Sequence, residues 1–375
     1  MEPMGTNIAT IDPYVAASSS ERLRVLLVAP PMLPVPPPTY AGTERVVATI
    51  GEELHRRGHF VALVGAGDSE VPYEHIPTVE RSLWSTGYDG DVASYMQHTV
   101  EIAWREAHRF DIVHAHLENH GFVFAEHCET PVISTLHGRL DVAGMPELLQ
   151  AHGRVPLVAI SDSQRRWFPD QNWVATIHHG LPLDSMPFST EPGDYLAFVG
   201  RVTPEKGVAE CIELARSVDL KLKIAAKVYD AHEKAHFAEV VEPAIRDGTV
   251  EFLGELGQPE RDEVYAGALA TLMLGAWPEP FGLVAIESMA TGTPVIARRA
   301  GALTETIEHG VTGFLVDDAT EGRLAIERAR GLDRARVRAL AIERFSPERM
   351  ADEYEEAYAR VLAGAGGSGV VPPAQ

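Results

Sequence analysis

Two glutamates, Glu279 and Glu287, lie eight positions apart in the stretch PEPFGLVAIESMATGTPVIA (278–297). Glu279 lies between two prolines, and Glu287 lies inside an apolar stretch that the spacing predicts to be a helix beginning near Phe281 and Gly282. A carboxylate among small apolar side chains is costly unless a polar partner meets it. Paired glutamates also occur on exposed helices, but these neighbours make simple exposure a poorer explanation. The pattern predicts that both carboxylates bind polar groups.

Two cations, Arg201 and Lys206, flank a short loop in FVGRVTPEKGV (198–208), between a predicted strand and a predicted helix. Cations beside a helix N-terminus form a site for phosphate or diphosphate. The alternative is that both are solvated surface charges, and the loop lacks the GxxxxGK[ST] pattern of an ordinary P-loop. The backbone N–H groups at Phe281 and Gly282, at the start of the second helix, are placed to bind the same phosphates.

The two glutamates then acquire separate predicted roles. Glu287 lies just over one turn into its helix, where its carboxylate can accept hydrogen bonds from both hydroxyls of a ribose. Glu279, held before the helix by its prolines, is expected to point into a cleft and to bind hydroxyls of a sugar on the far side of the diphosphate. These residues together predict a site for a sugar nucleotide.

The elements that position these residues alternate between strands and helices in both halves of the chain. Continuous apolar runs are typical of strands buried on both faces of a parallel sheet. The first half carries them at 23–29, 60–65, 111–116, 131–136, 157–161 and 174–179, with a helix from about Thr43 to His55 after the first. The second half carries them at 195–200, 221–226, 249–254, 270–275, 293–297 and 313–316, and helices are expected at about 321–344 and 347–362.

This alternation predicts an α/β protein made of two doubly wound domains that face a central cleft, where ligands of such folds bind. A segment rich in Pro, Ser and acidic residues, 181–194, is the expected linker. The predicted organisation is a flexible lead (1–20), a first domain (21–185), a second domain (186–345), a final helix (346–363) and a disordered tail (364–375).

Composition narrows the class of function. The 375 residues carry a formal charge of −22, which argues against nucleic acid as a partner and makes membrane association unfavourable. Only two cysteines occur, Cys128 and Cys211, so no disulfide framework is expected. Without a signal peptide pattern or an apolar run long enough to span a bilayer, the sequence predicts a soluble cytoplasmic protein.

Several motifs in consistent order resemble the retaining family 4 glycosyltransferases of GT-B fold. PEPFGLVAIESMATGTPVIA is similar to the E-x7-E motif of that family, and GRVTPEKG is similar to its phosphate-binding loop. YAGTERVV (40–47), DIVHAH, STLHG (134–138), AISDSQR (159–165) and GFLV extend the resemblance over residues 23 to 360. Several motifs at compatible spacings are far more specific than any one of them.

The resemblance implies roles for individual residues. It implies that Arg201 and Lys206 bind the diphosphate and stabilise the leaving group. Glu279 would then hold hydroxyls of the transferred sugar, and Glu287 would hold the donor ribose. The remaining positions implied are Gly42 in the first-domain phosphate loop, His137 near the reacting centre, and the backbone amides of Phe281, Gly282 and Leu283.

The activity implied is transfer of a hexose from a nucleoside-diphosphate sugar with retention of anomeric configuration. A UDP-sugar is favoured over GDP- or dTDP-sugars only by its frequency in the family. No metal ion or other cofactor is expected, because two cations and a helix terminus take the place of a metal. The expected acceptor is a soluble small molecule or glycan. The loops that would choose it, at about 66–90 and 138–153, match no pattern that identifies it.

Other functions stay open. A nucleotide-sugar 2-epimerase also uses a GT-B cleft, and a non-catalytic sugar-nucleotide binding protein would keep the same donor residues. A dehydrogenase is weaker, since no GxGxxG follows the first strand. The first-domain loop departs from the family by having Ala41 where a first glycine is usual, and Lys227 is either a ligand of phosphate or base or a surface lysine.

Two further histidines, His114 and His116, end a predicted strand. They are expected to point to opposite faces of the sheet, and that divergence is the argument against a metal site there.

Overall fold

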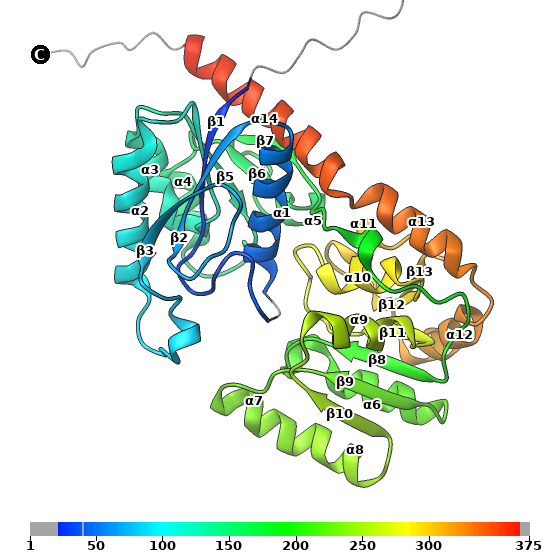
Figure 1. Ribbon diagram of the computed structural model, residues 1–375. Coiled ribbons are helices and arrows are strands. Elements are labelled where there is room, and N and C mark those ends of the chain that lie inside the picture. Colours follow the sequence, from blue (N-terminus) through cyan, green and yellow to red (C-terminus); the bar gives the residue numbers. More distant parts are fainter. Residues whose placement is uncertain (1–21, 40, 368–375) are drawn as a thin grey trace, which may run out of the picture.

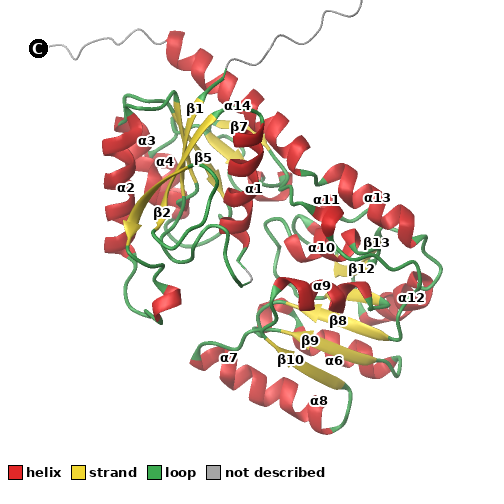
Figure 2. Ribbon diagram, in the orientation of Figure 1, coloured by secondary structure: helices red, strands yellow, loops and turns green. Residues whose placement is uncertain are grey.

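The computed structural model describes residues 22–39 and 41–367, which form two parallel α/β domains side by side with a cleft between them (Figure 1). Figure 2 shows each sheet sandwiched between helices. The two sheets have seven and six strands, so the predicted doubly wound architecture of both halves is confirmed.

The first sheet has the strand order β3-β2-β1-β4-β5-β6-β7, and every pairing in it is parallel. Its strands are β1 (Arg24–Val28), β2 (Phe60–Ala66), β3 (Glu74–Val79), β4 (Ile112–Ala115), β5 (Val132–Leu136), β6 (Leu157–Ala159) and β7 (Trp173–Thr176). The helices around it are α1 (Gly42–Arg56), α2 (Ala93–Ala107), α3 (Phe122–His127), α4 (Met145–Ala151) and α5 (Asp162–Arg165), with short 3₁₀ turns η1 (Trp84–Thr86) and η2 (Glu118–Gly121).

The second sheet has the order β10-β9-β8-β11-β12-β13 and is also parallel. Its strands are β8 (Tyr195–Val199), β9 (Lys221–Ala225), β10 (Val250–Gly254), β11 (Ala270–Met273), β12 (Val295–Arg298) and β13 (Gly313–Val316). The helices are α6 (Val208–Ser217), α7 (Ala231–His236), α8 (Glu242–Arg246), α9 (Gln258–Ala266), α10 (Leu283–Ala290), α11 (Leu303–Thr306), α12 (Ala319–Ala329) and α13 (Arg334–Arg344); the turns are η3 (Leu183–Ser185), η4 (Pro204–Lys206) and the π-helical η5 (Phe237–Val241).

The final helix, α14 (Pro347–Gly367), leaves the second domain and lies against the first (Figure 1). Its buried Tyr354 and Tyr358 join the core cluster formed by β1, β2 and α1. Arg57, just after α1, binds Asp352 and Glu355 of α14, each at 2.7 Å. The C-terminal helix therefore completes the core of the first domain.

A second contact joins the domains beside the cleft. Glu305, on α11 of the second domain, accepts hydrogen bonds from the backbone N–H groups of Asp162 and Ser163 at 2.8 and 2.7 Å. The carboxylate thereby caps the N-terminus of α5, a position that favours negative charge. Ser161 adds a hydrogen bond to the carbonyl of Pro280 at 2.7 Å. These bonds fix the segment AISDSQR against the E-x7-E segment.

Three local expectations differ from the structure. The edge strand β3 was not expected, because EHIPTV is polar and half-exposed instead of continuously apolar. The helix expected at 321–344 is two helices, α12 and α13, because Asp333 caps a new N-terminus by accepting the N–H of Arg336 at 3.1 Å. Residues 364–367, expected in a disordered tail, belong to α14; the rest of that tail and the lead 1–20 lie outside the described residues.

None of the helices in the described part of the chain has the length and apolar character that spanning a bilayer demands.

Candidate active site

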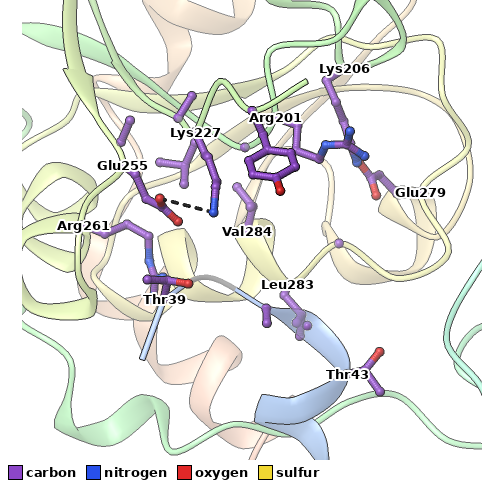
Figure 3. Close-up of a pocket in the computed structure, with 18 of the residues that line it drawn as sticks. Thr39, Thr43, Arg201, Lys206, Lys227, Glu255, Arg261, Glu279, Leu283 and Val284 are labelled. Carbon is purple, nitrogen blue, oxygen red and sulfur yellow. Dashed lines mark hydrogen bonds and ion pairs between the residues drawn. The ribbon is translucent and has the colours of Figure 1, made fainter. Parts of the chain in front are cut away.

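A cavity of about 840 Å³ lies between the carboxyl ends of the two sheets. That size suits a ligand larger than a single sugar. Eight of the predicted site residues line it: Gly42, His137, Arg201, Lys206, Glu279, Phe281, Gly282 and Leu283. Figure 3 shows the second-domain wall, where Arg201, Lys206 and Glu279 lie together and Lys227 pairs with Glu255 nearby. The fold brings most of the predicted site into one place.

The two predicted phosphate ligands already have carboxylate partners. Lys206 donates to Glu279 at 2.5 Å, and Arg201 donates to Glu233 of α7 at 2.6 Å. The Arg201 side chain is 64% exposed, so its charge faces the cavity as well as Glu233. A diphosphate carries more charge than one carboxylate, so it is the stronger competitor for both cations.

Two glycines, Gly207 and Gly282, let the cationic loop and the N-terminus of α10 come close to the cavity. Gly207 follows Lys206 with φ of 72°, and a Cβ there would lie 2.4 Å from the backbone nitrogen of Gly275. Gly282 precedes α10 with φ of 94°, and a Cβ there would lie 2.7 Å from Leu303. Only glycine tolerates both the left-handed backbone and the close approach. The first turn of α10 therefore opens directly into the cavity.

Glu287 is the one predicted site residue that does not line the cavity. It is fully buried one turn into α10, where it pairs with Arg45 of α1 and accepts a hydrogen bond from Tyr265 at 3.1 Å. Arg261 lies 3.5 Å away. The ion pair with Arg45 joins the two domains across the cleft. For Glu287 to bind a ribose, Arg45 has to move away.

The first-domain loop that is predicted to bind phosphate meets this same region. Ala41 is the N-cap of α1, in extended conformation and without a side-chain cap. Gly42 begins the helix, and a Cβ there would lie 3.4 Å from the side chain of Leu283 across the cleft. The methyl of Ala41 is accommodated, and Gly42 lies close to Leu283 of the facing domain.

His137 follows β5 and belongs to a stack of imidazoles. Its Nε2 lies 2.8 Å from Nδ1 of His116, and its ring stacks on His179 with centroids 5.1 Å apart. Burial lowers the pKa of His137 to about 3, so the ring is neutral at physiological pH. His137 can therefore orient a hydroxyl by hydrogen bonding but does not supply a positive charge.

The expectation for His114 and His116 was wrong. Residues two apart on a strand share a face, and their rings lie against each other at a tilt of 38°, with centroids 4.0 Å apart. His114 is hydrogen-bonded to Tyr358 and Thr135, each at 2.8 Å. Within residues 22–39 and 41–367 no group of three His, Cys, Asp or Glu side chains is arranged to hold a metal ion. Independence from metal stays a prediction.

Two polar side chains, one buried and one partly buried, hold the backbone segment that carries His137. Glu118 accepts the backbone N–H groups of His137 and Gly138 at 2.9 and 3.0 Å. Gln164 donates to the carbonyls of Leu136 and Gly138, both at 2.8 Å. Glu118 has a φ of 51°, a strained backbone for a non-glycine residue. The strain and the four hydrogen bonds together fix the backbone of the cleft histidine.

The first-domain wall also has an aromatic part that sequence reasoning missed. Trp84, Tyr88 and Asp89, in the connection between β3 and α2, line the cavity. They lie in the region 66–90, where no motif indicated a role. Glu118 and Arg45 were missed for a different reason: they flank or lie within quoted motifs, but their partners are more than 18 residues away in sequence.

Two family profiles match the chain in the order of its domains. The family described as Glycosyltransferase Family 4 matches residues 40–172, and the family described as Glycosyl transferases group 1 matches residues 187–331. The chain belongs to the family 4 glycosyltransferases of GT-B fold. It is therefore an enzyme of the transferase class.

Individual relatives agree with this assignment. A D-inositol 3-phosphate glycosyltransferase of Pseudarthrobacter chlorophenolicus is 26% identical over 341 residues, covering 74% of this chain and 77% of its own length. The crystal structure of AviGT4, a glycosyltransferase involved in avilamycin A biosynthesis, superposes with a TM-score of 0.70 at 25% identity, covering 91% of this chain and 98% of that one. HepE of Anabaena, solved in complex with UDP-glucose, has a TM-score of 0.68 at 18% identity and covers 92% and 100%.

Proposed function

We propose that the chain is a retaining hexosyltransferase that uses a nucleoside-diphosphate sugar, works without a metal ion, and glycosylates a soluble acceptor in the cytoplasm. The observation that carries the proposal is the meeting of Arg201, Lys206 and the N-terminus of α10 on one wall of the interdomain cavity. Breaking a glycosyl–phosphate bond develops negative charge on the leaving diphosphate. Cations and helix N–H groups that are fixed before reaction stabilise that charge.

The partner of Lys206 supports a second role. Glu279 lies beside Lys206 at the cavity surface, so its carboxylate is 2.5 Å from a group that would bind phosphate. When diphosphate takes the lysine, the carboxylate is released to accept hydroxyls of the transferred sugar. We assign Glu279 to sugar binding and not to covalent catalysis.

The donor ribose would bind at Glu287 once Arg45 has moved. Glu287 is buried in the turn of α10 that follows Leu283 and Val284. Those two residues line the cavity (Figure 3). Exchange of Arg45 for a ribose diol keeps the carboxylate hydrogen-bonded in both states, which a buried charge requires. Donor binding and the contact between α1 and α10 are then linked.

The choice of donor base and acceptor is less constrained. HepE, a neighbour in fold, was solved with UDP-glucose, which makes uridine the first nucleotide to test. The name of the inositol-phosphate relative makes a phosphorylated polyol one acceptor to test, beside the soluble small molecule or glycan expected from the acidic sequence.

The test is a titration of the purified full chain with UDP, GDP and dTDP in a metal chelator, read as thermal stability and heat of binding. A nucleotide at about one hundred times its Kd should stabilise the fold by about 2–3 kcal/mol. The Lys206→Ala variant should no longer release hexose from the nucleotide sugar that corresponds to the nucleotide bound. The matched control is Lys234→Ala, which removes an exposed lysine of α7 and should behave as wild type. No binding of any nucleotide would contradict the proposal.

A further inference from the structure

The aromatic part of the cavity belongs to residues 83–90, which we call the Trp84 loop. Trp84, Ser85, Tyr88, Asp89 and Gly90 line the cavity, and the indole of Trp84 is 55% exposed. In Figure 1 this connection, with its short turn η1, hangs from the first domain toward the cleft and faces α7 of the second.

The backbone of the Trp84 loop is held in place although Trp84, Ser85 and Asp89 are exposed. Leu83 and Trp84 donate their N–H groups to the carbonyls of Pro31 and Met32 at 3.1 and 3.0 Å. The buried residue before the loop, Ser82, bonds to Asp68 through its backbone N–H at 2.8 Å. The exposed indole is therefore a fixed surface and not the tip of a loose loop.

An indole, a phenol ring and a carboxylate on one wall have the chemistry to bind a sugar ring. Aromatic rings offer large apolar contact area at low conformational cost, and the C–H face of a pyranose can lie against them. The carboxylate of Asp89 accepts hydrogen bonds from hydroxyls.

The charges divide the cavity into two unlike walls. Its lysines and arginines, Arg201, Lys206, Lys227 and Arg261, all come from the second domain; the described lining residues of the first domain include none. Two first-domain arginines near the cleft are already paired: Arg45 with the buried Glu287, and Arg139 with Asp141. The guanidinium of Arg139 also lies over the ring of Trp277 at 4.3 Å. An anionic acceptor on this wall would meet Asp89 without a cation to offset it, which is unfavourable.

We propose that the Trp84 loop is the acceptor subsite and that its ligand is an uncharged sugar or glycoside, not a phosphorylated polyol. The inference rests on the proposed transferase function, because it assigns to the acceptor the part of the cavity opposite the donor cations. Trp84 holds the apolar face of the ring, and Asp89 accepts its hydroxyls.

The experiment is saturation-transfer NMR on the full chain, with the nucleotide that binds most tightly present. The probes are maltose, cellobiose and methyl α-mannoside as neutral sugars, and glucose 6-phosphate and myo-inositol 1-phosphate as anions. At least one neutral sugar should bind, and the anions should bind at least about tenfold more weakly, as expected for a charge repelled at close range. Trp84→Ala should weaken neutral-sugar binding roughly tenfold, the cost of losing one aromatic contact.

Two further variants sharpen the result. Trp167→Ala removes an equally exposed tryptophan of the same domain that does not line the cavity, and it should leave sugar binding unchanged. Asp89→Lys should strengthen binding of the anions by roughly fivefold while changing neutral-sugar binding little. Both loop positions are exposed, so these variants keep the fold.

Tighter binding of the anions, neutral-sugar binding that survives Trp84→Ala, or no binding of any neutral sugar would each overturn the proposal. Failure of the transferase function has a different result, since nucleotide binding and hexose release are measured separately in the same samples. If neutral sugars bound at Trp84 but no nucleotide bound, the proposed donor site would be wrong and the proposed sugar subsite would stand.

Discussion

The two walls of the cleft do opposite things with charge. The second-domain wall exposes cations and pairs them with carboxylates at its surface, as Lys206 is paired with Glu279. The first-domain wall buries neutral imidazoles, with His137 and His116 hydrogen-bonded to each other. The difference indicates that one wall is built to exchange one anion for another, and the other to hold an uncharged group in a fixed orientation.

The two walls also differ in how much free energy it costs to break their polar contacts. An ion pair with both partners accessible to solvent, such as Lys227 with Glu255, costs little to exchange, because water already screens it. The backbone of His137 is held by two hydrogen bonds to the partly buried Glu118, and it cannot move without breaking both at once. Substitutions on the two walls should therefore fail in different ways.

The largest expected effect is on turnover at the cationic wall. Lys206→Ala should lower kcat about 10²–10³-fold while changing nucleotide Kd much less, because the lysine acts most on charge that develops at the transition state. Steady-state kinetics and a nucleotide titration on the same protein measure both. A Kd that rises as much as kcat falls would place Lys206 in ground-state binding instead.

The next effect concerns the ion pair that joins the walls. Glu287→Ala should weaken donor binding roughly tenfold and also lower the free energy of unfolding by about 3 kcal/mol, because Arg45 and Arg261 lose a buried partner. Arg45→Ala should act in the opposite direction on the donor and tighten it, since the ribose no longer competes with a guanidinium. Nucleotide titration and urea unfolding separate the two effects. Unchanged affinity in Glu287→Ala would contradict the ribose assignment.

Glu118 gives a pH test of the neutral wall. Burial raises its pKa to about 7, while in an unfolded chain the pKa is near 4.5. Between these values the folded protein holds a proton that the unfolded chain has lost, so this contribution to stability is complete below pH 4.5 and is lost as pH rises through 7.

Glu118→Gln removes that titration and keeps a carbonyl oxygen in place of the accepting carboxylate oxygen. The difference in unfolding free energy between wild type and variant should change by about 2–3 kcal/mol from pH 4.5 to pH 8, in the direction that favours the variant at high pH. Chemical unfolding at several pH values measures it. Parallel profiles would show that Glu118 keeps an ordinary pKa.

The smallest expected effect is on the pH dependence of kcat, to which no histidine titration of His137 should contribute. Because burial lowers the pKa of His137 to about 3, kcat between pH 5.5 and 8 should contain no ionisation from this residue. His137→Asn should lower activity about equally at every pH in that range, so the two pH–rate profiles should be parallel. A limb that is present in wild type and absent in the variant would mean that His137 titrates in catalysis.

Most of the fold could be predicted because buried parallel strands are continuous apolar runs. RVLLV and YLAFV were expected within two residues of β1 and β8. The strand β3 lacks that pattern because it lies at the edge of the sheet, where it pairs only with β2. Its side chains are therefore partly exposed. The break between α12 and α13 depends on a single capping aspartate, which a helical pattern of apolar residues does not reveal.

The site divides in the same manner. The motif residues could be predicted because backbone geometry fixes what they do, as Gly282 shows. Trp84 and Glu118 could not, because their roles depend on contacts between distant segments. The ring contact of His114 and His116 was within reach of the sequence, and only a misapplied strand periodicity concealed it.

The course of α14 has a consequence for synthesis on the ribosome. Tyr354 and Tyr358 fill the core of the first domain, yet they are made after the whole second domain. The nascent first domain has to wait with the buried side of His114 uncovered until the last helix emerges. We expect a chain stopped at residue 345 to have a protease-sensitive first domain and a resistant second one, which limited proteolysis would measure. The domain that is translated first is therefore the one that finishes folding last.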